Sequence, residues 1–171
     1  MKRKLSHVDR GGRVVMVDTS AKMPTLRRAR ARGEVHTSTR VLQELRRGTM
    51  QKGDVVAVAR LAGIAAAKQT ATLIPLCHVL PLDHVEVDID IDSDDDRIRI
   101  EAEVVCRAAT GAEMEAIVAV LIAAATVYDM CKAMDRGMSI GSVELMQKSG
   151  GQSGPWRRSP APGRTKLRRN P

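Results

Sequence analysis

The sequence predicts an α+β fold in which helices pack on one face of an antiparallel sheet. Three observations indicate this class: a long apolar helix at residues 111–133, a second helix-forming run at residues 53–68, and two alternating stretches at residues 85–92 and 97–103. Strands in hairpin succession form antiparallel sheets, and helices segregated to one face of such a sheet define the class. A length of 171 residues suggests one domain.

The first quarter of the chain is basic and only partly regular. Residues 1–12 predict a frayed arm and residues 14–18 a short strand. Residues 27–32 carry four arginines. They form either a solvated basic segment or a site that holds an anionic ligand. Residues 39–47 predict a helix that ends at the following glycine, Gly48.

The helix predicted over residues 53–68 begins with a capping residue, Asp54. Lys52 stands just before it, where the helix dipole disfavours a cation. It is either an exposed lysine without function or part of an anion site with the free amides there. Pro75 then sets a loop, which contains His78. A lone loop histidine is more often structural, but His78 is the best-placed group in the chain for proton transfer near neutral pH.

Alternating residues predict a hairpin with one buried and one charged face over residues 85–92 and 97–103. The acidic turn between them, residues 93–96, lacks the glycine and glutamate spacing of a calcium loop and is interpreted as a solvated turn. Residues 138–145 predict another strand. Residues 148–154 form a flexible, phosphate-tolerant loop without the Walker pattern.

The helix at residues 111–133 is apolar all round in its centre, which predicts a buried core helix. The apolar centre of 12 residues, 116–127, is shorter than the roughly 20 that cross a bilayer. Glu113 and Asp129 mark its polar ends, about 24 Å apart along a helix axis. If both ends act on one small ligand, a second subunit must supply one of them, so we expect an oligomer.

The net charge of +8 belongs to the end of the chain. Six basic residues and no acids lie in residues 155–171, a Pro- and Arg-rich segment that is predicted to be disordered. The remaining 22 basic residues nearly balance 20 acidic ones. Trp156 and Tyr128, the only aromatic residues, are too few to stack on single strands, so nucleic-acid binding is not expected as the main function. Three cysteines without pairing motifs, and no apolar run after the basic start, predict a reduced, cytoplasmic protein without a membrane partner.

Eight short motifs occur in order over roughly residues 5–154. They are M-V-D-T-S-A-K (16–22), K-G-D-V (52–55), A-R-L-A-G-I-A-A-A-K (59–68), L-I-P-L-C-H (73–78), V-E-V (85–87), G-A-E-M-E-A (111–116), Y-D-M-C-K-A (128–133) and K-S-G-G (148–151). Together they resemble the molybdenum cofactor biosynthesis protein C family, the cyclic pyranopterin monophosphate synthases.

The resemblance implies a ferredoxin-like fold and a homohexamer, a trimer of dimers with sites at subunit contacts. It implies a lyase that converts 3′,8-cyclo-7,8-dihydro-GTP to cyclic pyranopterin monophosphate and diphosphate in molybdenum cofactor biosynthesis. The synthase domain would be residues 1–154 and the basic tail residues 155–171. No metal site is expected, and whether Mg²⁺ accompanies the triphosphate is left open.

The resemblance also assigns roles to residues of this sequence. The predicted catalytic residues that it implies are Asp129, Lys132 and Lys52, and the predicted substrate-binding residues are Leu76, Cys77, His78, Met114, Glu115 and Lys148. The chemistry of the residues themselves adds His78 as a catalytic candidate, and Glu113 and Arg27 as substrate-binding candidates.

The spacing of these residues agrees with proton-transfer chemistry. Asp129 and Lys132 share a helix face at a spacing of three, which lets a carboxylate and an ammonium couple. A lysine near other cations is expected to have a lowered pKa. Gln152 departs from the family, where a second lysine is common, so one phosphate contact would come from elsewhere, with Arg27 and Arg30 as candidates.

Overall fold

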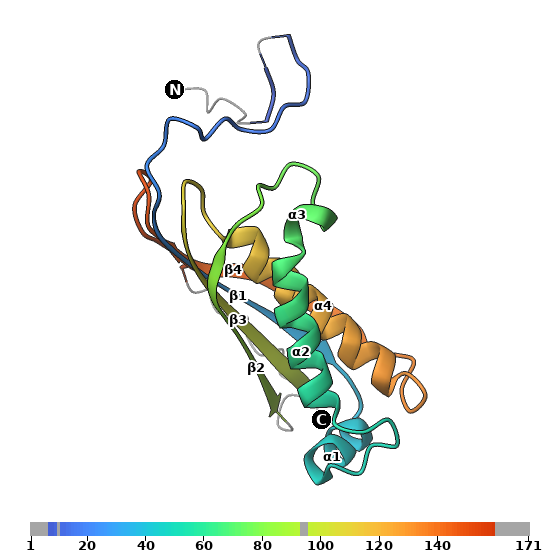
Figure 1. Cartoon of the computed structure of the whole chain (residues 1–171). Coiled ribbons are helices and arrows are strands. Elements are labelled where there is room, and N and C mark those ends of the chain that lie inside the picture. The colour runs from blue at the N-terminus through green and yellow to red at the C-terminus, as the bar shows by residue number, and fades with distance from the viewer. Residues whose placement is uncertain (1–6, 10, 93–95, 160–171) are drawn as a thin grey trace, which may run out of the picture.

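The fold is a single antiparallel sheet covered by helices on one face (Figure 1). The computed structural model describes residues 7–9, 11–92 and 96–159. The strand order is β2-β3-β1-β4-β5, and every pairing is antiparallel. The predicted α+β, ferredoxin-like class is confirmed. The strands are β1 (Thr25–His36), β2 (Leu82–Asp92), β3 (Arg97–Ala108), β4 (Ser139–Ser149) and β5 (Trp156–Arg157).

Strand β1 lies at the centre of the sheet, between β3 and β4, and the sequence did not predict it. The arginine-rich run alternates with small residues, and Ala29 and Ala31 are fully buried against the helices. Arg28, Arg30 and Arg32 alternate with them and form ion pairs with glutamates of β3 and β4. Residues 27–32 are therefore a strand with a buried alanine face and an outer face of about half-exposed arginines, and the solvated basic interpretation describes that outer face alone.

The helices follow the prediction closely. They are α1 (Thr39–Arg47), α2 (Val55–Lys68), α3 (Thr70–Leu73) and α4 (Glu113–Cys131). Gly48 ends α1 in the left-handed conformation, with φ of 67°, and its N–H closes the last turn. Asp54 caps α2, accepting a hydrogen bond of 2.9 Å from the Ala57 N–H.

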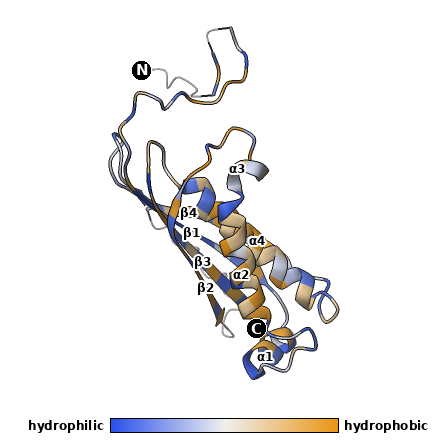
Figure 2. Ribbon diagram, viewed as in Figure 1, coloured by the Kyte–Doolittle hydropathy of each residue, from blue (hydrophilic) through white to orange (hydrophobic). Residues whose placement is uncertain are grey.

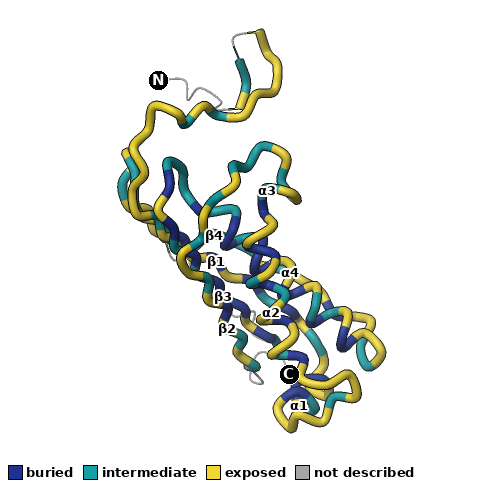
Figure 3. The backbone as a smooth tube through the Cα atoms, viewed as in Figure 1, coloured by how far each residue is buried: buried dark blue, intermediate teal, exposed yellow. Residues whose placement is uncertain are grey.

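Helix α4 is the core helix that the sequence predicts. Figures 2 and 3 show its apolar and buried residues along the side that meets α2 and the sheet. Ala116, Ala119, Val120 and Ala123 are fully buried. Gly63 of α2 permits the close approach, since a Cβ there would lie 2.9 Å from the Ala119 carbonyl oxygen. By length and composition α4 could cross a membrane, but half of it or more is buried against its own chain, as in any core helix.

Two segments differ from the predicted pattern at the ends of the described chain. Residues 14–18 form no strand, because Val14 makes only an isolated bridge to Val8 within an arm that extends away from the sheet (Figure 1). Trp156 and Arg157, which the sequence assigns to the tail, pair with β4 as β5. Residues 160–171 of the tail and residues 93–95 of the acidic turn lie outside the described residues.

Candidate functional site

The predicted site residues form two clusters at opposite ends of α4. The helix has 19 residues, so its ends are about 28 Å apart. Asp129 and Lys132 stand at its C-terminal end, and Lys52 joins them from the turn before α2. The remaining predicted residues lie near its N-terminal end, around Glu113 and Glu115.

The C-terminal cluster is a carboxylate between two ammonium groups. Lys132 Nζ lies 2.6 Å from Asp129 Oδ1, and Lys52 Nζ lies 3.8 Å from Asp129 Oδ2. Lys52 also donates a hydrogen bond of 2.9 Å to the Asp129 carbonyl oxygen. The unfavourable position of Lys52 beside the positive end of α2 is thus offset by the negative end of α4. All three side chains are about half exposed, which leaves them accessible to a ligand.

The pKa values of this cluster are shifted toward the charged forms. The hydrogen bond from Lys132 lowers the pKa of Asp129, and the nearby Lys52 charge adds to this. The same hydrogen bond to Asp129 raises the pKa of Lys132. The expectation of a lowered lysine pKa is therefore wrong for Lys132, because its nearest charge is a carboxylate and not another cation. Lys132 is therefore held in its cationic form.

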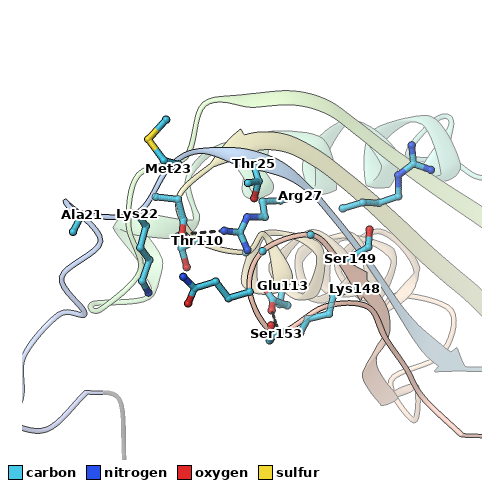
Figure 4. A pocket seen from close by; sticks show the side chains of 16 residues that line it. Ala21, Lys22, Met23, Thr25, Arg27, Thr110, Glu113, Lys148, Ser149 and Ser153 are labelled. Carbon is cyan, nitrogen blue, oxygen red and sulfur yellow. Dashed lines mark hydrogen bonds and ion pairs between the residues drawn. The ribbon is translucent and has the colours of Figure 1, made fainter.

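Two adjoining cavities occupy the other end of the molecule. The larger, of about 730 Å³, lies between the start of β1 and the glycine-rich loop after β4 (Figure 4). The smaller, of about 650 Å³, extends past the loop before β2. They share a wall formed by Lys22, Thr110, Gly111, Glu113, Lys148 and Ser153.

The larger cavity is cationic and is shaped by the backbone. Lys148 forms an ion pair of 2.8 Å with Glu113, and Arg27 donates hydrogen bonds of 3.1 Å to the carbonyl oxygens of Ala108 and Ala109. Gly151 has a φ of 76°, and a Cβ there would overlap the Arg27 guanidinium. Only glycine lets this loop close over the arginine.

The smaller cavity contains a buried acid. Glu115 is 4% exposed, and burial, reinforced by the Glu113 charge, raises its pKa to about 7. Burial, with the Glu115 charge, also raises the pKa of the Cys77 thiol, so Cys77 is not a reactive nucleophile. Glu115 therefore titrates near neutral pH and can hold or release a proton there.

The cavities bring together all predicted substrate-binding residues. The larger one contains Arg27, Glu113 and Lys148, and the smaller one contains Leu76, Cys77, His78, Met114 and Glu115 as well as Glu113 and Lys148. His78 thus lies with the substrate-binding group and not with Asp129. Arg30, the alternative phosphate contact, is paired with Glu101 on the opposite face of the sheet and lines neither cavity.

Lys22, Thr110 and Ser153 are cavity residues that the sequence did not single out. Lys22 belongs to the motif at residues 16–22, and Ser153 lies two residues after the motif at residues 148–151. Neither motif by itself indicates that these residues line a cavity. Among the described residues, no group of three or more His, Cys, Asp or Glu side chains is arranged to hold a metal ion.

Comparison with known proteins identifies the family. The profile of the MoaC family matches residues 16–151. A cyclic pyranopterin monophosphate synthase of Thermomicrobium roseum is 53% identical over 155 residues, covering 91% of this chain and 93% of the relative. The synthase of Roseiflexus sp. strain RS-1 is 55% identical over 150 residues, covering 88% and 95%. The synthase of Trichodesmium erythraeum is 46% identical over 152 residues, covering 89% and 92%. With four-fifths of its length inside the family profile and half its residues shared with these synthases, the chain belongs to the MoaC family.

Proposed function

We propose that this chain is a cyclic pyranopterin monophosphate synthase, a lyase of molybdenum cofactor biosynthesis. The observation that carries the proposal is that two cavities of different chemistry adjoin each other. A cationic cavity under the glycine-rich loop adjoins a second cavity that contains the buried acid Glu115 and the loop of His78. Relatives that are about half identical over nearly the whole chain carry this synthase name.

The substrate is 3′,8-cyclo-7,8-dihydro-GTP, and the products are cyclic pyranopterin monophosphate and diphosphate. The triphosphate is assigned to the larger cavity, because Lys148 and Arg27 line it and are donors suited to phosphate oxygens. The fused ring system fits the smaller cavity, where Leu76 and Met114 offer apolar contact and His78 and Glu115 offer polar groups. Mg²⁺ accompanying the triphosphate would contact phosphate oxygens in the larger cavity.

The reaction requires ring opening, reclosure as a pterin, and loss of diphosphate as the cyclic phosphate forms. Lys132 supplies a positive charge, because its raised pKa keeps it protonated. Asp129 stays ionised and holds the ammonium groups of Lys132 and Lys52 in place. At the other cluster, Glu115, whose pKa burial raises to about 7, exchanges protons with the ring system, and His78 lines the same cavity.

Both clusters act on one ligand only if two chains meet. Asp129 and Glu113 are 16 positions apart on one unbroken helix, or about 24 Å, and the ligand is shorter than that. We therefore propose a homo-oligomer, a hexamer built as a trimer of dimers, in which the Asp129 end of one protomer lies against the Glu115 end of another. The cytoplasm, where the thiols of Cys77, Cys106 and Cys131 stay reduced, is the proposed compartment.

Incubation with the cyclised GTP intermediate tests the function. The pterin product and diphosphate should appear together in equal amounts. Turnover of the intermediate without diphosphate release, or no turnover at all by folded protein, would refute the assignment. Glu86→Gln, which changes an exposed carboxylate on β2, is the matched control for charge changes.

Subunit mixing tests the shared site. Asp129→Asn and Glu115→Gln chains should each be inactive, because the first removes the charge that holds Lys132 and Lys52 and the second removes a group that exchanges protons. Exchange of subunits between them creates some interfaces with both wild-type groups, so part of the activity should return. Verified exchange with no return of activity would show that each site is built within one chain.

A further inference from the structure

One carboxylate ties the turn after α4 to the start of α1. Asp135 Oδ2 accepts a hydrogen bond of 2.9 Å from the Ser38 N–H and one of 3.1 Å from the Thr37 hydroxyl. Asp135 Oδ1 accepts a third, of 2.8 Å, from the Gly137 N–H of its own turn. The first two bonds join residues 97 and 98 positions apart, and they connect two elements that lie at the same end of the molecule (Figure 1).

Asp135 supplies a cap that α1 lacks within its own sequence. Ser38, the N-cap of α1, makes no side-chain capping hydrogen bond, and the first turn of α1 contains no acidic residue. In a capping box, a glutamate three residues further on accepts the bond from the N-cap N–H, and a negative charge there stabilises the helix. The bonds from Ser38 and Gly137 lower the pKa of Asp135, so this charge is present at neutral pH. The start of α1 is therefore held by a residue that follows α4.

A cavity separates the loop of Lys52 from the end of α4. Its volume is about 370 Å³. Arg40, Met50 and Lys52 line it from α1 and from the loop before α2, while Met130 and Met134 line it from the end of α4. Atoms that line an empty space lose the contacts that close packing would give them. Packing at this place therefore does little to fix Lys52 relative to α4.

Two polar links cross this gap. Within the part of the chain that the structure describes, residues 37–54 form hydrogen bonds or ion pairs with residues 128–138 only through Asp135 and through Lys52. Lysine has a flexible four-carbon stem, so the link from Lys52 to Asp129 adapts to the separation of the two segments. The side chain of Asp135 is short and is held by three hydrogen bonds. The Asp135 link therefore sets the separation.

We propose that Asp135 is a positioning residue that holds Lys52 at its working distance from Asp129 and Lys132. The inference rests on the proposed function, in which these three side chains act together, and it adds a group that acts on them without touching the ligand. Loss of the Asp135 carboxylate would free the loop of Lys52 to move relative to α4. The pair of Asp129 with Lys132 would persist, because both residues belong to the end of one helix.

The test compares the variants Asp135→Ala, Asp135→Asn, Thr37→Val and Asp88→Ala with the wild-type chain. Asparagine keeps one acceptor oxygen, and Thr37→Val removes a bond on the α1 side while leaving the turn after α4 untouched. Asp88 is an exposed aspartate of β2 and is the matched control. Three quantities are measured: kcat, KM for the cyclised nucleotide, and the rate at which limiting acetic anhydride acetylates Lys52. Mass spectrometry reads the acetylation, with the exposed Lys68 as reference.

The kinetic effect should fall on kcat. Asp135→Ala should lower kcat about tenfold or more, because a misplacement of about 1 Å at a reacting group is enough for losses of this order. KM should change little, since the predicted substrate-binding residues line the cavities at the other end of α4. Asp135→Asn and Thr37→Val should lower kcat less than Asp135→Ala, and Asp88→Ala should leave it unchanged.

The labelling effect should be confined to Lys52. Acetylation of Lys52 should be faster in Asp135→Ala than in wild type, because the amine is no longer held 2.9 Å from the Asp129 carbonyl oxygen. Acetylation of Lys132 should keep its wild-type rate, because its partner Asp129 moves with it. This contrast reports the position of the Lys52 loop directly and does not depend on turnover.

Unchanged kcat, or unchanged acetylation of Lys52, in folded Asp135→Ala protein would overturn the proposal. A role in stability alone would lower the unfolding temperature and leave the acetylation of Lys52 in the folded chain as it was. If Asp135→Ala does not fold, Thr37→Val decides by the same two criteria. Failure of the proposed function looks different, since wild-type protein would form no pterin product while acetylation of Lys52 would still separate Asp135→Ala from wild type.

Discussion

Replacement of Glu115 by glutamine should make the chain more stable than wild type at high pH, and the gain should vanish at low pH. The carboxyl group is 4% exposed, and burial raises its pKa from 4.5 to about 7. Between these values the folded chain keeps a proton that the unfolded chain has released. Wild-type stability contributed by this group is therefore complete below pH 4.5 and is lost as pH rises through 7.

The size of the effect follows from the two pKa values. The interval from 4.5 to about 7 corresponds to about 3 kcal/mol, which wild type loses between pH 4.5 and pH 8. Glutamine has the same shape and cannot ionise. The stability difference between Glu115→Gln and wild type should therefore shift by about 3 kcal/mol in favour of the variant over this range.

Denaturant unfolding at pH 5 and pH 8 measures this shift, with the protomer concentration held fixed because association also stabilises. Glu86→Gln is the control, since the exposed Glu86 carboxylate loses little hydration on folding. A difference between Glu115→Gln and wild type that stays constant with pH would refute the reasoning, because it would mean that the carboxylate is hydrated in the folded chain.

Two further predictions concern the end of the chain. Gly151→Ala should lower stability by about 1–3 kcal/mol and raise KM, because alanine at a φ of 76° is strained and its Cβ would overlap the Arg27 guanidinium. Thermal unfolding and steady-state kinetics measure the two effects, and an unchanged KM would contradict the prediction. Truncation after Arg158 should leave unfolding unchanged. Truncation after Gly154 should destabilise by about 1 kcal/mol, because it removes β5 and the ion pair of Arg158 with Glu144; equal stability of the two truncated chains would contradict this.

The features predicted correctly depend on neighbours in sequence. Gly48 as a helix end and Asp54 as a cap require only residues within one turn, and the alternation in β2 and β3 requires only the hairpin itself. The pairing of Asp129 with Lys132 follows from helix geometry in the same way. Such local patterns can be read without knowing the tertiary structure.

The features that were missed depend on residues far apart in the chain. Strand β1 buries alanines and exposes arginines, which hides the alternation of a central strand, and its arginines are neutralised by glutamates more than 70 positions away, such as Glu101. The pKa direction of Lys132 required knowing which charge is nearest. Recognising Lys22 required knowing that the residues just before β1 line the same cavity as the glycine-rich loop.

The rigidity of α4 decides how the two clusters can cooperate. Motion within one chain would have to close about 24 Å, and this would break a helix of 19 residues that packs on both α2 and the sheet. Loss of that packing would expose Ala119, Val120 and Ala123, whose burial supplies much of the core. The free energy needed for such a closing motion is therefore far larger than the free energy that a contact with the ligand contributes. The proposed homo-oligomer removes this conflict, because a second chain would bring a charged pair that is already formed and would leave both helices intact.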